Sequence, residues 1–263
     1  MNTQDTQHIL EEVTNIENTL EESLTHTKNP SRFKKFQLTT PVAVILGALI
    51  LSFSHITYGL LVSGTNTTKN NEMFTGRPVD ASDFATGNTK SDVIVIEYSD
   101  TQCQFCAQLH PAIQKIQSEY SSKVAFVYRY FPLTQIHPEA FDEARAIHCV
   151  GTIAGAQKRV EYINEMFTYK IGKQNMVLPK GGREALAKNI NIDAQAFTSC
   201  MNNGEAAGVV NASIQEGITA KVEGTPATFV LIKTRTGYEV VSKIDGARPY
   251  EYIKAVIEEA LSR

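Results

Sequence analysis

The feature that most restricts the fold of this chain is a Cys-x-x-Cys pair at the junction of a predicted strand and a predicted helix. A continuous β-branched run at 93–96 is typical of a strand covered on both faces. Cys103 and Cys106 follow it, and apolar residues at helical spacing then predict a helix that ends near Tyr120. Because a second strand-like run covers 124–131, the sequence predicts a β–α–β unit with the cysteine pair at the start of its helix.

The position of Cys103 at a helix N-terminus has a chemical consequence. Free backbone N–H groups and the positive end of the helix dipole favour an anion there. The thiolate is the nucleophile in thiol–disulfide exchange, and this setting lowers a cysteine pKa from about 8.5 to roughly 3.5–7.5. Cys106 lies one turn further on, so we expect it to be the less exposed thiol, which resolves a mixed disulfide formed by Cys103.

A zinc half-site is the alternative interpretation of the pair. His148 and Cys149 could complete a set of four ligands. Neighbouring residues on a helix point to different sides, however, which disfavours such a set. We therefore predict no metal and no other cofactor.

Two further positions point to the same chemistry. Glu97 lies on the apolar strand, where burial would raise its pKa and allow it to exchange a proton with Cys106. The alternative is a glutamate at the strand end that faces solvent. Pro226 directly precedes another strand-like run; it is either an ordinary trans-proline or a cis-proline, since X–Pro bonds are the ones for which cis is cheap.

The other two cysteines, Cys149 and Cys200, fall on apolar faces of helices predicted between the second strand and Pro226. Four cysteines in 263 residues are too few for a scaffold built from disulfides. The residues themselves leave two interpretations, which are a pair of buried free thiols or a bridge across a helical domain.

An apolar segment at 41–62 precedes all of these motifs. No charged residue occurs from Phe36 to Thr68, and 22 residues suffice to cross a hydrocarbon core of about 30 Å. Because about 40 residues precede this segment and its length exceeds that of a signal peptide's apolar core, we expect an uncleaved anchor rather than a cleaved signal. We therefore predict one transmembrane helix at 41–62.

The basic residues around this segment indicate its orientation. Those before it outnumber those after it: Lys28, Arg32, Lys34 and Lys35 against Lys69 and Arg77. The positive-inside bias predicts a cytoplasmic tail at 1–40 and a main domain outside the cytoplasm. A stretch rich in Thr, Asn, Gly and Ser at 63–76 is typical of a flexible tether.

Composition argues against some partners. The net charge is −3 and no basic stripe is present, so we expect no nucleic-acid partner. Apolar spacing at 9–20 indicates a short amphipathic helix, but two heptads are too few to predict a coiled coil. We expect a monomer.

Taken in order, these motifs resemble the DsbA-like proteins of the thioredoxin fold. The resemblance covers about Phe74 to the C-terminus. It is carried by the run 97–106 with His110-Pro111, then Tyr130-Phe131-Pro132-Leu133, His137-Pro138, Gly224-Thr225-Pro226 and Gly246-Ala247-Arg248-Pro249-Tyr250.

The resemblance implies an α/β thioredoxin fold at 77–263, with a helical domain inserted at about 137–222. It implies that Cys103 attacks, that Cys106 resolves and that Glu97 is a buried acid. A cis-Pro226 would lie beside the cysteine pair, with the backbone of Thr225 binding a substrate strand. The resemblance also favours a structural disulfide, Cys149–Cys200.

The implied function is oxidation of cysteines in exported proteins outside the cytoplasm, followed by reoxidation of the pair by a quinone-linked membrane thiol oxidase. Gln104 and Phe105 depart from the family pattern and add no positive charge, so we expect a less oxidising couple than that of the most strongly oxidising members. A reductase or isomerase is the alternative within the same chemistry. The alternative of another class is a non-catalytic binding or chaperone-like module, in which Cys103–Cys106 is merely a bridge.

Overall fold

The computed structural model of this chain describes residues 72–263. The predicted tail, the transmembrane helix at 41–62 and most of the tether lie outside these residues. Within the described part of the chain, no helix combines the length and apolar character needed to cross a membrane.

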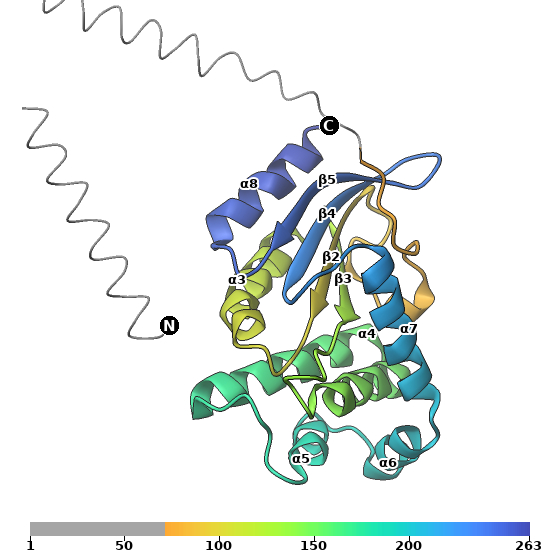
Figure 1. Cartoon of the computed structure of the whole chain (residues 1–263), viewed down its shortest axis with the longest axis vertical. Helices are drawn as coiled ribbons and strands as arrows, with labels where there is room; N and C mark the ends of the chain where they lie inside the picture. Colours follow the sequence, from red (N-terminus) through yellow and green to blue (C-terminus); the bar gives the residue numbers. More distant parts are fainter. Residues whose placement is uncertain (1–71) are drawn as a thin grey trace, which may run out of the picture. The chain divides into compact units, whose positions relative to one another are not determined.

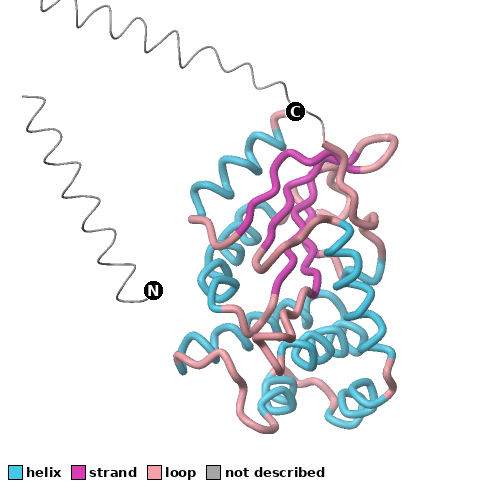
Figure 2. The backbone as a smooth tube through the Cα atoms, in the orientation of Figure 1, coloured by secondary structure: helices cyan, strands magenta, loops and turns pink. Residues whose placement is uncertain are grey.

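A five-stranded mixed sheet forms the centre of the domain (Figures 1 and 2). Its spatial order is β1-β3-β2-β4-β5, and only the β2–β3 pair is parallel. The strands are β1 (Thr86–Gly87), β2 (Val93–Ser99), β3 (Ala125–Tyr130), β4 (Ala227–Lys233) and β5 (Tyr238–Asp245). Because a parallel pair needs a crossover connection, helix α3 (Gln104–Tyr120) joins β2 to β3, as the β–α–β pattern predicts.

Helices cover both faces of this sheet. Helices α3 and α8 (Tyr250–Leu261) contact each other and lie on one face, and α7 (Glu205–Thr219) lies on the other (Figure 1). Successive side chains of β2 point to opposite faces, so Val95 packs under α3 while Ile96 packs on the α7 side. All seven residues of β2 are buried, which explains the continuous apolar run at 93–96.

The chain between β3 and β4 folds as a helical insert. It contains α4 (Ala140–Lys173), α5 (Gly182–Asn189), α6 (Ala194–Asn202) and α7. The long α4 consists of two helices that meet at Gly155, whose φ of 83° is in the region that favours glycine. Asp193 caps α6, because its side chain accepts a hydrogen bond of 2.7 Å from the backbone N–H of Ala196.

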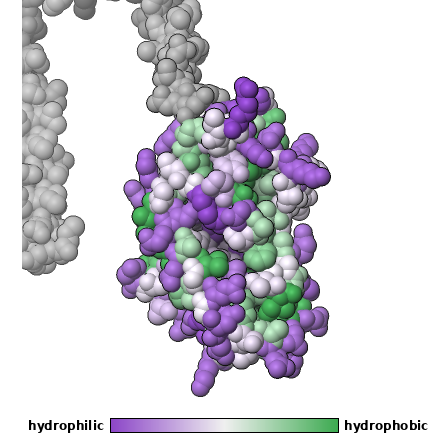
Figure 3. All heavy atoms as spheres, turned by 90° about the vertical axis from the view of Figure 1, so that its right-hand side faces the viewer, coloured by the Kyte–Doolittle hydropathy of each residue, from purple (hydrophilic) through white to green (hydrophobic). Residues whose placement is uncertain are grey.

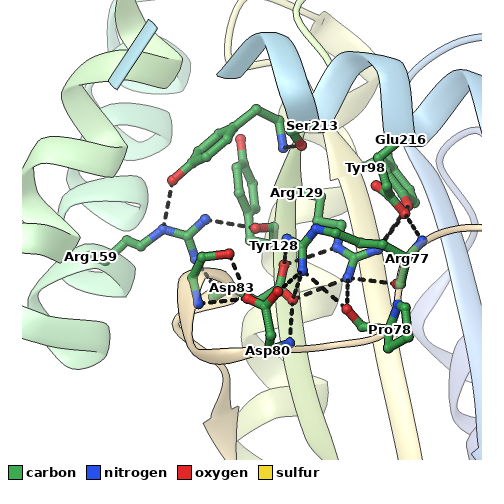
Figure 4. Close-up of polar contacts among 12 residues, drawn as sticks. Arg77, Pro78, Asp80, Asp83, Tyr98, Tyr128, Arg129, Arg159, Ser213 and Glu216 are labelled. Carbon is green, nitrogen blue, oxygen red and sulfur yellow. Dashed lines mark hydrogen bonds and ion pairs between the residues drawn. The ribbon is translucent and has the colours of Figure 1, made fainter. Parts of the chain in front are cut away.

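A cluster of buried charges lies on the α7 side of the sheet (Figure 4). Arg129 on β3 donates hydrogen bonds to Asp83 and to Glu216 of α7, and half-buried Arg77 also pairs with Asp83. Arg129, Asp83 and Glu216 are all buried, so each of these charges depends on the others for solvation. The outer surface on this side mixes hydrophilic and hydrophobic residues (Figure 3).

The prediction of a flexible tether up to residue 76 is wrong at its C-terminal end. Met73 forms a bridge with Glu239, and the backbone N–H of Phe74 donates to the carbonyl of Tyr238 at 2.8 Å. The ring of Phe74 also packs edge-on against Phe229, with 5.1 Å between the ring centroids. Residues 73 and 74 therefore pair with the sheet edge and belong to the packed domain.

Candidate active site

The cysteine pair lies at the start of α3. Cys103 is the N-cap residue, with extended backbone angles, and Cys106 lies in the first turn. Both are free thiols and both are buried: Cys103 is 5% exposed and Cys106 is fully covered. The difference in exposure is in the direction that an attacking and a resolving thiol require.

The Thr225–Pro226 segment, whose peptide bond is cis, lies against Cys103, although Thr225 is 122 positions from Cys103 in the sequence. When Cys103 is protonated, its thiol donates to the backbone carbonyl of Thr225, with 3.3 Å between sulfur and oxygen. Antiparallel pairing of β2 with β4, which places Tyr98 opposite Ala227, sets this juxtaposition. The hydroxyl of Thr225 is buried and has no hydrogen-bond partner among the described residues. It is therefore available to donate a hydrogen bond to the Cys103 sulfur.

The two thiols differ in acidity. A hydrogen bond from the Cys106 side chain lowers the pKa of Cys103 to about 5, against the opposing effect of burial, and the backbone N–H groups of Cys106 and Phe105 add to this effect. Burial raises the pKa of Cys106 well above its ordinary value, and the neighbouring charges of Cys103 and Glu97 raise it further. Cys103 is therefore a thiolate at neutral pH and Cys106 a thiol.

Glu97 is buried on the face of β2 that α3 covers, so the alternative of a solvent-facing glutamate is wrong. Burial raises the pKa of its carboxyl to about 7. A cavity of about 30 Å³ lies beside it, lined in part by His110, Tyr128 and Asn164. This volume is sufficient for a water molecule. Glu97 can therefore hold or release a proton near neutral pH, close enough to Cys106 to affect the pKa of that thiol.

Replacement of Glu97 by glutamine is expected to stabilise the oxidised protein at pH 8 but not at pH 4. A carboxyl whose folded pKa is raised contributes stability below its unfolded pKa of about 4.5, and that stability is lost as the pH rises through about 7. A shift of this size corresponds to about 3 kcal/mol. Urea unfolding of the wild type and the variant at both pH values measures it, with the cysteines oxidised so that they do not titrate. An equal difference between the two proteins at both pH values would show that Glu97 titrates normally.

Sequence interpretation missed Asp100, which organises the turn before Cys103. Its carboxylate accepts hydrogen bonds from the backbone N–H groups of Gln102 and Leu133, each at 2.7 Å, and from His137 Nδ1 at 2.8 Å. Its own N–H donates to Cys106 Sγ at 3.5 Å. The bond to Gln102 is a local Asx turn that the sequence could have indicated, but the bonds to 133 and 137 depend on the tertiary fold.

The remaining predicted residues lie in the insert. Cys149 and Cys200 form a disulfide between α4 and α6, with 5.7 Å between their Cα atoms. His148, the other residue considered as a zinc ligand, has its Nε2 within 3.3 Å of the Thr152 hydroxyl. Within residues 72–263, no group of three or more potential metal ligands comes together.

Comparisons with known proteins show which family this chain resembles. The family model described as Thioredoxin matches residues 80–259. A protein of Salinispora tropica named Na(+)/H(+) antiporter NhaA 3 is 29% identical over 154 residues, which are 58% of this chain and 22% of that protein. One of Rickettsia conorii, named "Putative protein-disulfide oxidoreductase", is 27% identical over 158 residues, which are 58% of this chain and 54% of that protein. The chain thus spans about half or less of either relative.

Among solved structures, α-DsbA1 of Wolbachia pipientis matches with a TM-score of 0.61 at 20% identity, over 70% of this chain and 94% of that one. At this level of identity the match concerns the fold, which includes the sheet, the crossover helix α3 and the inserted helices. The family model covers more than half of the chain. This chain therefore belongs to the thioredoxin family, and its fold is that of the DsbA-like proteins.

Proposed function

We propose that this protein is a thiol–disulfide oxidoreductase that oxidises cysteine pairs in other proteins. The observation that carries the proposal is the acidic Cys103, with a pKa of about 5, at the N-terminus of α3 and against the Thr225 carbonyl. A cysteine that serves only as a structural bridge needs neither a lowered pKa nor a place at a helix N-terminus. These features argue against the alternative of a binding module in which the pair is merely a bridge.

The reaction starts from the Cys103–Cys106 disulfide. A substrate thiolate attacks Cys103 Sγ; a substrate–Cys103 disulfide forms, the Cys103–Cys106 bond breaks and the electron pair goes to Cys106. Because the pKa of Cys106 is raised, its sulfur takes a proton as it leaves, and Glu97 is the neighbouring acid that can supply it. A second substrate thiolate then attacks the substrate sulfur and releases Cys103 as a thiolate. The substrate loses two electrons and the enzyme pair gains them.

The acidity of Cys103 favours the oxidising direction. A thiolate of low pKa is a good leaving group in the last step, and stabilisation of the reduced form makes the couple a stronger oxidant. Gln104 and Phe105 supply no charge, so local hydrogen bonds from the first turn of α3 account for the shift. The same shift would make the reduced pair a weaker electron donor, which is unfavourable for a reductase.

The setting that we propose is extracytoplasmic. The apolar segment at 41–62 would anchor the chain, with 1–40 in the cytoplasm and the catalytic domain outside. The Cys149–Cys200 disulfide supports this setting, because such bonds persist in oxidising compartments. Exported cysteine-containing proteins would be the substrates of a monomeric enzyme, and a quinone-linked membrane thiol oxidase would reoxidise the pair.

The experiment that tests this function measures the reduction potential of the Cys103–Cys106 couple in the full chain, together with trapping by Cys106→Ala. We expect a potential at or above about −230 mV and mixed disulfides between Cys103 and exported proteins. A potential near about −270 mV would instead indicate a reductase. An unreactive Cys103 with no trapped protein would exclude an enzyme of this class.

A further inference from the structure

A buried ion pair in the helical insert contacts the turn that precedes Cys103. Glu143 and Lys170, both on α4, form a salt bridge, and both side chains are completely buried. The ammonium of Lys170 also donates to the backbone carbonyl of Thr101 at 3.0 Å. The hydroxyl of Thr101 donates to the same carboxylate oxygen of Glu143 that accepts from Lys170. One threonine is therefore held by its carbonyl and by its hydroxyl.

The location of this pair is costly. Removal of two charges from water requires several kcal/mol per ion, and well-packed apolar residues of similar volume are often as stable or more stable. The surrounding core is apolar, with Tyr162, Ile163, Met166 and Phe167 on the same helix. Burial raises the pKa of Glu143 and lowers that of Lys170, so each charge depends on the other. Stability by itself is a weak reason for two charges at this place.

The contacts of Glu143 and Lys170 with the turn before Cys103 give a stronger reason for burying this pair. Thr101 is two residues before Cys103, and the preceding Asp100 accepts the backbone N–H of Cys103 at 3.1 Å. The residue after Thr101 is also held by the insert side, because the Gln102 side chain accepts the backbone N–H of Glu139 at 3.1 Å. The turn at 100–102, which leads into the first N–H groups of α3 beside the Cys103 sulfur, is thus hydrogen-bonded at three consecutive residues.

We propose that Glu143 and Lys170 are positioning residues, which hold the Thr101 turn and thereby set the acidity of Cys103 and the redox potential of the pair. This inference rests on the proposed function, because a potential has meaning only for a working couple. It assigns the insert a part in the chemistry, although neither residue contacts the reacting sulfurs through a hydrogen bond in the described structure.

Two variants test the proposal. Thr101→Val removes the hydroxyl and keeps the shape of the side chain, and Lys170→Met removes the charge. Loss of one such hydrogen bond corresponds to about a 3- to 10-fold change in an equilibrium constant. We expect each variant to lower the equilibrium constant for oxidation of glutathione by that factor and to raise the midpoint of Cys103 thiolate formation, read from absorbance near 240 nm.

The matched control is Arg129→Lys, which weakens the buried ion-pair cluster on the α7 side of the sheet (Figure 4). It is expected to lower thermal stability without a change in the glutathione equilibrium or the thiolate midpoint. The proposal is overturned if Thr101→Val folds with a midpoint and an equilibrium constant like those of the wild type. If Lys170→Met does not fold, Thr101→Val still decides the matter. Failure of the proposed function itself would appear separately, as an unreactive Cys103 in the wild type.

Discussion

Cys103→Ser is expected to lower the rate of thiol–disulfide exchange at pH 7 by at least about 100-fold. The remaining thiol, Cys106, has a pKa well above 9, so no more than about 1% of it is thiolate at that pH, whereas Cys103 is almost fully ionised. Cys106 is also completely covered, which removes access as well as nucleophilicity. The rate of mixed-disulfide formation by the reduced protein with a model disulfide measures this loss.

The companion variant, Cys106→Ala, separates the two roles. It keeps the attacking sulfur and should form one mixed disulfide per molecule without release. Because the Cys106 side chain is the main cause of the low pKa of Cys103, the thiolate midpoint should rise above about 5 in this variant. Equal rates for the two variants, or a midpoint unchanged by Cys106→Ala, would contradict the assignment of attacker and resolver.

Removal of the Cys149–Cys200 disulfide is expected to lower the free energy of unfolding by about 4 kcal/mol. The bond closes a loop with a sequence separation of 51, and the chain-entropy model assigns a loop of this length that much restriction of the unfolded chain. The double variant Cys149→Ala/Cys200→Ala, compared with the wild type by urea unfolding at constant pH, measures the effect. Cys103→Ser is the control for the loss of a buried sulfur without loss of this bridge.

The same double variant shows whether the bridge takes part in the chemistry. We expect the potential of the Cys103–Cys106 couple to remain unchanged, because the bridge joins α4 to α6 and lies outside the turn at 100–103. A loss of less than about 1 kcal/mol would contradict the chain-entropy prediction for this bridge. A shifted potential would make the bridge part of the redox site.

Local patterns determined much of the architecture. The β-branched run of β2, the helical spacing after Cys106 and the strand-like run of β3 each depend on the period of the element itself. The same applies to the Asp193 cap and to the strand that begins after Pro226. Because these signals involve residues close in the sequence, no knowledge of distant contacts was needed to predict the position of the cysteine pair at a strand-to-helix junction.

Only the tertiary structure decided the environment of that pair. Burial of Glu97 requires α3 above it, and the contact between Cys103 and Thr225 requires β2 to pair with β4. The hydrogen bond from Lys170 to the Thr101 carbonyl joins residues 69 positions apart, so no short sequence pattern predicts it. Acidity and redox potential depend on solvation and on such long-range hydrogen bonds, so the sequence by itself determined which atoms react, and the fold decided how readily they do so.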